Sequence, residues 1–204
     1  MLLIMKNALI IFVRIPELGK VKTRLAKDLG EEKALEVYKE LLQHTHDISV
    51  DLECDKFVFY TDRIENDDIW ENDLFSKYQQ EGDSLGDRMM LAFHKLLQLN
   101  YKNVVIIGSD CPSLSPIIIN EAFERLENDD IVIGPSSDGG YYLLGMSKLI
   151  PELFQHKKWS SDSVLADTIK DTVKLQKQYS FLTCLLYTSP SPRDRTRSRM
   201  PSSA

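Results

Sequence analysis

The sequence predicts an α/β domain built on a mostly parallel sheet. Short apolar runs rich in β-branched residues alternate along the chain with segments that carry apolar residues at helical spacing. Such alternation is typical of parallel strands joined by crossover helices. The chain has 204 residues, of which 43% are hydrophobic, so it is long enough to bury the core of one domain.

The first half of the chain predicts a βαβ unit. Residues 8–13 (ALIIFV) form the first expected strand, and residues 56–60 (KFVFY) form the second. Between them, residues 31–46 place four large apolar side chains on one face of a helix. A strand, a helix and a second strand in this order favour parallel pairing of the two strands.

The second half continues the alternation. A helix is expected over residues 85–99, followed by a buried strand at residues 103–107 (NVVII). Another helix is expected over residues 116–126, because its first residue is a proline and proline suits the first turn of a helix. Two short strands, residues 131–134 and 141–145, flank a Gly-Gly turn.

The composition changes abruptly near the end of the chain. We expect the domain to cover residues 1–183, and residues 184–204, rich in Ser, Pro and Arg, to be disordered. This segment resembles a translated sequencing-adapter read-through, which predicts a C-terminally truncated domain whose native sequence differs after about Thr183. The alternative is a genuine basic, disordered tail.

Net charge and cysteine content exclude several classes of protein. The tail contributes +3 to the formal charge of −6, so residues 1–183 carry −9 and make a poor binder of nucleic acid. Three cysteines without CxxC spacing support neither a zinc site nor a disulfide framework. The apolar run at residues 8–13 is too short to span a membrane. We therefore expect a cytoplasmic protein.

A basic loop follows the first expected strand and precedes a helix, where an open α/β sheet places its ligand. Gly19 lets the backbone approach a ligand closely, and Arg14, Lys20, Lys22 and Arg24 supply cations. These features predict a phosphate site, although the loop matches neither GxxxxGK[ST] nor GxGxxG. The alternative is a solvated basic turn.

Asp110 lies in Gly-Ser-Asp-Cys-Pro, directly after the expected strand at residues 103–107. A carboxylate there faces the same edge of the sheet as the basic loop and could hold a divalent cation that bridges to a diphosphate. The alternative is that Asp110 caps the turn or helix that follows.

Three further segments carry candidate ligand-binding residues. In Ser-Asp-Gly-Gly-Tyr-Tyr, two glycines permit a tight turn that leaves Asp138, Tyr141 and Tyr142 exposed at its edge, although Asp-Gly between strands is also a common hairpin signal. The segment at residues 82–88 could contact a base or ribose, or could simply cap the helix through Ser84. Trp159 could form a wall of a sugar site, or belong to the core.

Five strings in this order resemble a known family: RIPELGKVKTRLA, QEGDSLGDRM, GSDCPSL, GPSSDGGYYLLG and WSSDSVL. The chain resembles a bacterial and archaeal family of expected glycosyltransferases, formerly a domain of unknown function, related to molybdenum-cofactor and phospholactate guanylyltransferases. The resemblance covers most of residues 8–165. It implies a three-layer α/β/α sandwich with the nucleotide-diphospho-sugar transferase (glycosyltransferase A-type) fold.

The resemblance also implies site residues. Nucleotide and diphosphate binding is carried over to Arg14, Gly19, Lys20, Lys22, Thr23, Arg24, Gly82, Gly86, Asp87 and Arg88. Sugar or acceptor binding is expected at Gly139, Gly140, Tyr141, Trp159 and Ser161. A metal, Mg²⁺ or Mn²⁺, is expected at Asp110, although the chain has Gly-Ser-Asp where the wider pattern has Asp-x-Asp.

The sequence thus predicts a metal-assisted transferase that moves a sugar from a nucleoside-diphosphate sugar to a small-molecule acceptor, with Asp110 and Asp138 as catalytic residues. The related nucleotidyltransferases typically carry a more glycine-rich first loop, whereas this loop has a single glycine. The resemblance therefore favours sugar transfer over the alternative, nucleotidyl transfer from a nucleoside triphosphate to a small phosphorylated metabolite. A second alternative is a non-catalytic nucleotide-binding protein. The donor base and sugar, the acceptor and the oligomeric state have no signature in the sequence.

Overall fold

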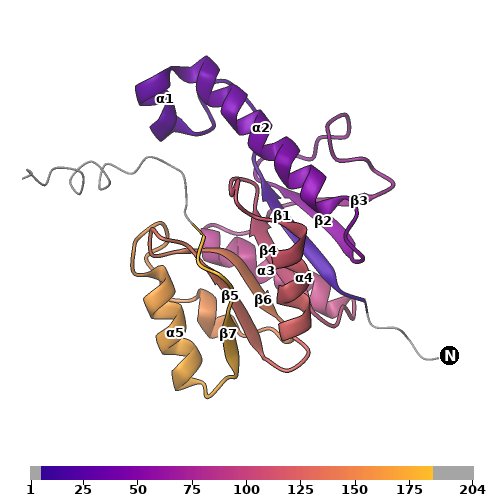
Figure 1. Cartoon of the computed structure of the whole chain (residues 1–204), viewed down its shortest axis with the longest axis vertical. Coiled ribbons are helices and arrows are strands. Elements are labelled where there is room, and N and C mark those ends of the chain that lie inside the picture. Colours follow the sequence, from indigo (N-terminus) through magenta and orange to yellow (C-terminus); the bar gives the residue numbers. More distant parts are fainter. Residues whose placement is uncertain (1–5, 186–204) are drawn as a thin grey trace, which may run out of the picture.

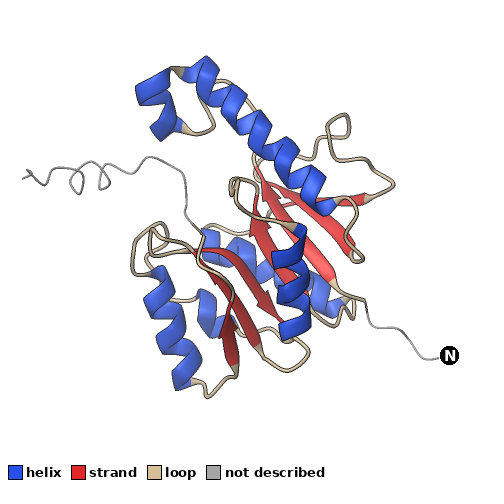
Figure 2. Ribbon diagram, viewed as in Figure 1, coloured by secondary structure: helices blue, strands red, loops and turns tan. Residues whose placement is uncertain are grey.

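A seven-stranded sheet runs through the middle of the molecule, with helices on both of its faces (Figures 1 and 2). The structure is a computed structural model, and it describes residues 6–185. The strands are β1 (Ala8–Val13), β2 (Asp55–Tyr60), β3 (Phe75–Gln79), β4 (Val104–Gly108), β5 (Ile131–Pro135), β6 (Tyr141–Met146) and β7 (Tyr179–Phe181).

The order of the strands across the sheet is β3-β2-β1-β4-β6-β5-β7. Strands β1 to β4 pair in parallel, and β5 pairs in parallel with β7. Strand β6 runs antiparallel to both of its neighbours, β4 and β5. The mostly parallel α/β sheet expected from the sequence is therefore confirmed.

Two helical layers cover the sheet. The helical segments are α1 (Thr23–Leu29), α2 (Glu31–Ser49), α3 (Leu85–Gln98), α4 (Pro116–Arg125), the 3₁₀ turn η1 (Pro151–Phe154) and α5 (Val164–Lys174). Helices α2 and α4 share one apolar core with the sheet, whereas α3, η1 and α5 share the other. This arrangement is the three-layer α/β/α sandwich that the resemblance implies.

The central strand β1 explains why the sequence signal there is so clear. Leu9 and Ile11 face the α2 and α4 side, whereas Ala8 and Ile10 face the α3 side, and all four are fully buried. A strand buried on both faces is a continuous apolar run. Strand β1 has the expected bounds, and its parallel pairing with β2, which begins at Asp55, confirms the βαβ unit.

Several elements have no clear signal in the sequence. Strand β3 (FSKYQ) lies at the edge of the sheet and buries only Phe75, so its pattern is mostly polar. Strand β7 is also an edge strand and has three residues. Helix α1 buries none of its residues and contacts chiefly α2. Short or exposed elements bury too little apolar surface to leave a periodic pattern.

The end of the described chain continues beside the sheet. Leu185 forms an isolated parallel bridge with Ser136, and its backbone N–H donates to the carbonyl of Pro135 at 3.1 Å. Residues 184 and 185, which the sequence assigns to the tail, thus lie against the domain. The rest of the expected tail, residues 186–204, lies outside the described residues. Within residues 6–185, no helix has both the length and the apolar character needed to cross a membrane.

Candidate functional site

The sheet topology brings the candidate segments to one edge. Because β1, β3, β4 and β5 run in the same direction, their carboxyl ends share an edge with the amino end of the antiparallel β6. The basic loop follows β1, the segment with Gly82 follows β3, and Asp110 follows β4. The turn with Asp138 joins β5 to β6.

Tyr38 of α2 holds the start of the basic loop. Its hydroxyl accepts from the backbone N–H of Arg14 at 2.9 Å and donates to the Arg14 carbonyl at 3.0 Å. The Ser109 hydroxyl lies 3.4 Å from the same oxygen, so one phenol links the loops that follow β1 and β4. Burial raises the pKa of Tyr38, which keeps the donor proton in place. The sequence shows Tyr38 only as a core position on a helical face.

The four predicted cations of the loop are not equivalent. The Lys20 ammonium lies 2.5 Å from the carboxylate of Glu17, which also accepts from Arg63 at 3.0 Å. The Arg14 and Arg24 side chains belong to exposed residues. Glu17 and Arg63 were not expected at the site, since neither belongs to a recognisable phosphate motif. The loop is therefore less positive than its lysines and arginines suggest.

The fourth cation, Lys22, contacts Asp110. The Lys22 Nζ lies 3.1 Å from Asp110 Oδ2, across 88 positions of sequence. Strands β1 and β4 are neighbours, with Phe12 opposite Gly108, and this pairing brings the two loops together. A Cβ on Gly108 would lie 3.1 Å from Asp110 Oδ1, so the glycine leaves room for the carboxylate. Helix α4 begins after Ser115, and Asp110 therefore does not cap it.

The segment at residues 82–88 forms a capping box at the start of α3. The backbone N–H of Asp87 donates to the Ser84 hydroxyl at 3.1 Å, and the Asp87 carboxylate accepts from the Ser84 backbone N–H, also at 3.1 Å. The Arg88 guanidinium donates to the Gly82 carbonyl at 3.0 Å. The capping interpretation is confirmed. The nucleotide role of Gly82, Asp87 and Arg88 stays a prediction.

Asp138 stabilises the glycine turn between β5 and β6 by accepting hydrogen bonds within it. Asp138 accepts from the Ser136 hydroxyl at 2.5 Å and from the Gly140 backbone N–H at 3.2 Å. Gly139 has a φ of 88°, and its carbonyl accepts from the backbone N–H of Leu165, the second residue of α5. The tight turn expected from Asp-Gly between two strands is therefore present. A catalytic role for Asp138 stays a prediction.

Trp159 joins two of the segments. A Cβ on Gly86 would lie 2.6 Å from the indole nitrogen of Trp159, so the first turn of α3 packs directly on this ring. The ring is half-buried against the α3 side of the core. The Ser161 hydroxyl donates to the Lys158 carbonyl at 2.7 Å, which stabilises the loop before α5. These contacts are structural, and the sugar-binding roles of Trp159 and Ser161 stay predictions.

The exposure expected for the two tyrosines is wrong, because Tyr142 packs in one apolar core and Tyr141 is half-buried against the other. The hydroxyl of Tyr141 is buried and has no hydrogen-bond partner in the part of the chain that the structure describes. We expect Tyr141→Phe to raise the free energy of unfolding by about 1 kcal/mol, because an unsatisfied buried hydroxyl is removed. The matched control is Tyr142→Phe. Since the Tyr142 hydroxyl donates to the Thr183 carbonyl at 2.8 Å, that change should lower the same quantity by about 1 kcal/mol.

Urea unfolding of the two variants, followed by circular dichroism, measures this difference. A lower stability for Tyr141→Phe would mean that its hydroxyl has a partner in solution. Addition of a nucleotide sugar then tests the sugar-binding role: a ligand that bonds this hydroxyl should stabilise the unaltered protein more than Tyr141→Phe.

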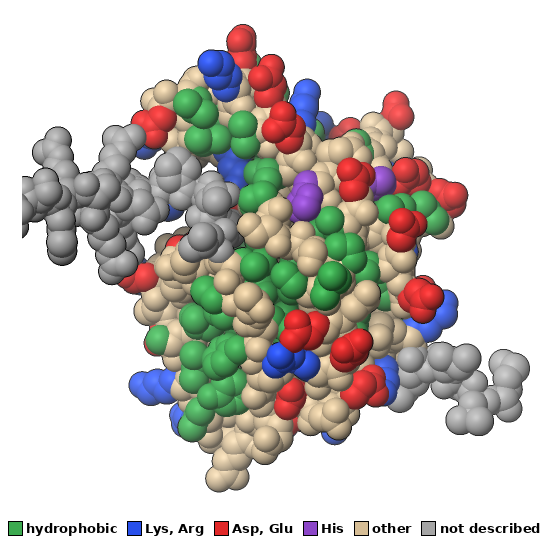
Figure 3. All heavy atoms as spheres, viewed as in Figure 1, with side chains coloured by type: hydrophobic (Ala, Val, Ile, Leu, Met, Phe, Trp, Pro, Cys, Tyr) green, Lys and Arg blue, Asp and Glu red, His purple; other side chains and the backbone are tan. Residues whose placement is uncertain are grey.

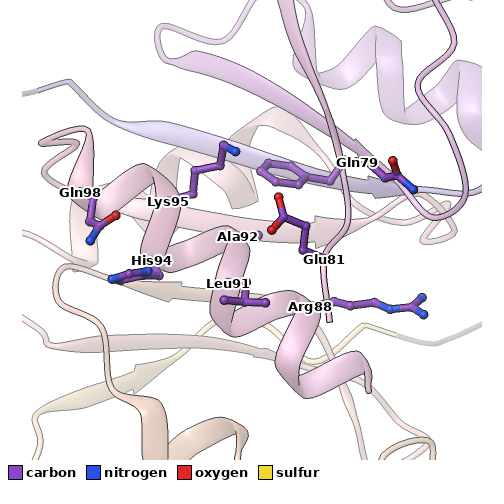
Figure 4. A pocket seen from close by; sticks show the side chains of 9 residues that line it. Gln79, Glu81, Arg88, Leu91, Ala92, His94, Lys95 and Gln98 are labelled. Atoms are coloured by element: carbon purple, nitrogen blue, oxygen red, sulfur yellow. The ribbon is translucent and has the colours of Figure 1, made fainter. Parts of the chain in front are cut away.

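Two hollows lie beside these segments. One, of about 150 Å³, runs along α3 and β3, and Arg88 is the only predicted site residue that lines it (Figure 4). The other, of about 420 Å³, lies between Leu18 and the start of α2 at Glu31. Neither is lined by Asp110 or Asp138. Acidic side chains are spread over the face seen in Figure 3, consistent with the negative charge of the domain.

The middle of the chain matches the profile of a known protein family. The profile of a family described as "uncharacterized protein conserved in bacteria (DUF2064)" matches residues 45–161, more than half of the chain. The chain belongs to this family. The match includes the second, third and fourth of the five strings that carry the resemblance and the first three residues of the fifth, whereas the basic loop precedes it. No match was found among curated proteins.

Solved structures share the fold of this DUF2064 protein. A protein of Desulfovibrio desulfuricans G20 described as a "putative nucleotide-diphospho-sugar transferase" is 29% identical, with a TM-score of 0.81 over 89% of this chain and 81% of that one. A 4-diphosphocytidyl-2C-methyl-D-erythritol synthase of Anaerococcus prevotii DSM 20548 is 12% identical, with a TM-score of 0.56 over 93% and 92%. The nucleotide-diphospho-sugar transferase fold is thereby confirmed.

A third similar structure is a CMP:2-keto-3-deoxy-manno-octonic acid synthetase complexed with CTP. It is 10% identical, with a TM-score of 0.52 over 91% of this chain and 92% of that chain. At this identity the likeness concerns the fold. The fold is therefore shared by a protein named for nucleotide-diphospho-sugar transfer, by a 4-diphosphocytidyl-2C-methyl-D-erythritol synthase and by a CMP:2-keto-3-deoxy-manno-octonic acid synthetase.

Proposed function

We propose that this protein transfers a sugar from a nucleoside-diphosphate sugar to a small-molecule acceptor. The observation that carries the proposal is the meeting of Lys22 and Asp110, which joins a phosphate-type loop to a carboxylate at the end of a central strand. The 29% identical protein named for nucleotide-diphospho-sugar transfer supports the same reaction. The single-glycine loop favours it over nucleotidyl transfer.

The basic loop would receive the diphosphate. When the bond between the sugar C1 and the diphosphate oxygen breaks, negative charge grows on that oxygen, and nearby cations lower the barrier. Lys22 already lies at the sheet edge, while Arg14 and Arg24 are exposed beside it. Gly19, with a φ of 74°, provides the left-handed turn of this loop without steric strain.

Asp110 would hold a divalent cation weakly by itself, and the diphosphate would complete the site. In residues 6–185, no three His, Cys, Asp or Glu side chains form a group that could hold a metal by themselves. One carboxylate with phosphate oxygens and water is, however, a common ligand set for Mg²⁺. A Mg²⁺ or Mn²⁺ ion held there would neutralise charge on the leaving diphosphate.

The glycine turn and the loop before α5 would bind the sugar and the acceptor. Asp138 would accept the proton of the acceptor hydroxyl while the oxygen of that hydroxyl attacks the sugar C1. Alternatively, Asp138 would bind a hydroxyl of the sugar. Its carboxylate already accepts two hydrogen bonds within the turn, which fixes its position. Tyr141 and Trp159 would shape this half of the site.

A donor panel tests the proposal. Purified protein is incubated with Mn²⁺, individual UDP- and GDP-linked sugars and a mixture of small acceptors, and release of the free nucleotide is measured. We expect release from one donor group, dependent on Mn²⁺. Pyrophosphate release from CTP or GTP would instead assign nucleotidyl transfer, and nucleotide binding without either product would assign a binding protein.

A further inference from the structure

We propose that Lys22 is an exchangeable counter-ion: it neutralises Asp110 in the ligand-free protein and moves to the diphosphate when the nucleotide binds. This inference rests on the proposed function, since it needs a diphosphate and a divalent cation at the same sheet edge. It goes further by assigning one residue to two successive partners. It predicts that cation and nucleotide binding are coupled through that residue.

The Lys22–Asp110 contact occupies part of the candidate cation site. One ammonium contacts one carboxylate oxygen, at 3.1 Å, and the side chains are 17% exposed for Lys22 and 34% exposed for Asp110. The Lys22 ammonium therefore covers Asp110 Oδ2, one of the two oxygens that a cation would use. A cation and the ammonium repel each other, so both cannot occupy that oxygen at full strength.

The Lys22–Asp110 pair can open at low cost once a diphosphate is present. The Asp110 side chain is 34% exposed, so water can stabilise its carboxylate when the ammonium leaves. The Lys22 side chain is only 17% exposed, so its ammonium would pass from the carboxylate to the diphosphate and would not be left buried without a counter-charge. Neither residue belongs to the apolar core.

The backbone that carries Lys22 is strained and borders a weakly packed helix. Its φ of 45° and ψ of 42° put a residue with a side chain in the left-handed region, at the start of α1. This conformation carries strain in a non-glycine residue. Helix α1 buries none of its residues and contacts chiefly α2 (Figure 1). The element next to Lys22 is therefore weakly packed, and a shift of the ammonium disrupts little of the core.

A diphosphate carries more negative charge and more acceptor oxygens than one carboxylate. At the basic loop it therefore offers Lys22 more charge-assisted hydrogen bonds than Asp110 does. Once Lys22 has moved, Asp110 is exposed to the cation that the diphosphate brings. Binding of nucleotide should thus strengthen binding of cation, and linkage requires the reverse effect to be equal.

The experiment compares Lys22→Gln, Lys22→Arg and Lys27→Gln with the unaltered protein. Lys27 is exposed on the same helix α1, so its change removes the same charge away from Asp110. Mn²⁺ is titrated alone, and the free ion is measured by electron paramagnetic resonance. UDP and GDP are then titrated by calorimetry with and without Mn²⁺, and urea unfolding confirms that each variant is folded.

Opposite effects on the two ligands are expected. Without nucleotide, Lys22→Gln should bind Mn²⁺ about 2- to 5-fold more tightly, the factor that corresponds to losing a partly exposed ion pair. With Mn²⁺ present, the same variant should bind the diphosphate roughly 10-fold more weakly. Lys22→Arg should keep Mn²⁺ affinity near that of the unaltered protein, and Lys27→Gln should change neither affinity by more than a small factor.

Several outcomes would overturn the exchange. Equal or weaker Mn²⁺ binding by Lys22→Gln, or no binding of Mn²⁺ by any variant, would show that Lys22 does not compete for Asp110. Unchanged diphosphate affinity would show that Lys22 has no second partner. Neither binding measurement depends on turnover. A donor panel without sugar transfer would therefore reject the proposed function, whereas the Mn²⁺ and diphosphate titrations would decide whether Lys22 competes for Asp110.

Discussion

Replacing Gly139 with alanine is expected to lower the free energy of unfolding by about 3 kcal/mol, since a left-handed backbone and a steric overlap both act against the new methyl group. Gly139 has a φ of 88°, and an added Cβ would lie 2.3 Å from the carbonyl oxygen of Asp162 and 2.7 Å from its Cα. Both are backbone atoms and cannot rotate away. The turn that carries Asp138 would separate from the start of α5.

Gly140→Ala is the matched control for this change. An added Cβ at Gly140 would lie 3.4 Å from Asp138 Oδ1 and 3.4 Å from Ser136 Oγ, which are ordinary contacts, and its φ is not positive. Chemical unfolding should show a large loss for Gly139→Ala and a change within about 1 kcal/mol for Gly140→Ala. Similar losses for the two variants would mean that the contact with Asp162 is absent in solution.

Replacing Asp110 with asparagine is expected to abolish the enhancement by Mn²⁺ of UDP or GDP binding. The same change is expected to lower the rate of sugar transfer by roughly 100-fold or more, because it removes a charge that would hold the metal in the transition state. Asparagine keeps the size of the side chain, so the loop after β4 should stay folded. Affinity for UDP or GDP without metal should stay the same or rise, because a negative charge leaves the phosphate site.

The control for Asp110→Asn is Asp62→Asn. Asp62 is an exposed carboxylate just beyond β2, at the same sheet edge, so its replacement changes the net charge equally. Calorimetric titration of UDP and GDP with and without Mn²⁺ should separate the two variants. If Asp110→Asn retains the full metal effect, then Asp110 is not the metal ligand, and the metal-assisted part of the proposal is wrong.

The sequence predicts the central elements of the fold with small errors at their ends. Strand β1 has the expected bounds, and α3 and α4 each end one residue before the expected end. These elements bury large apolar faces, and periodicity reports such faces directly. The edge strands β3 and β7, which have little or no buried surface, could not be recognised in this way.

The candidate site could likewise be predicted only in part from the sequence. The sequence indicates which segments carry glycines, cations and carboxylates, and the order of strands and helices predicts that they share a sheet edge. Contacts between distant residues are not encoded in local pattern. The bond of Tyr38 to the Arg14 backbone and the packing of Trp159 on Gly86 depend on how α2 and the loop before α5 dock on the sheet.

The sequence alone determined the α/β class, the βαβ unit and the five segments that resemble a transferase family, because those properties reside in residue type and spacing. Only the tertiary structure decided which partners the charged groups have. Lys22 lies against Asp110, 88 positions away, and Glu17 accepts from Arg63, 46 positions away. Ion pairs form between atoms within a few ångströms, and in this protein strand order, not distance along the chain, sets which atoms come that close.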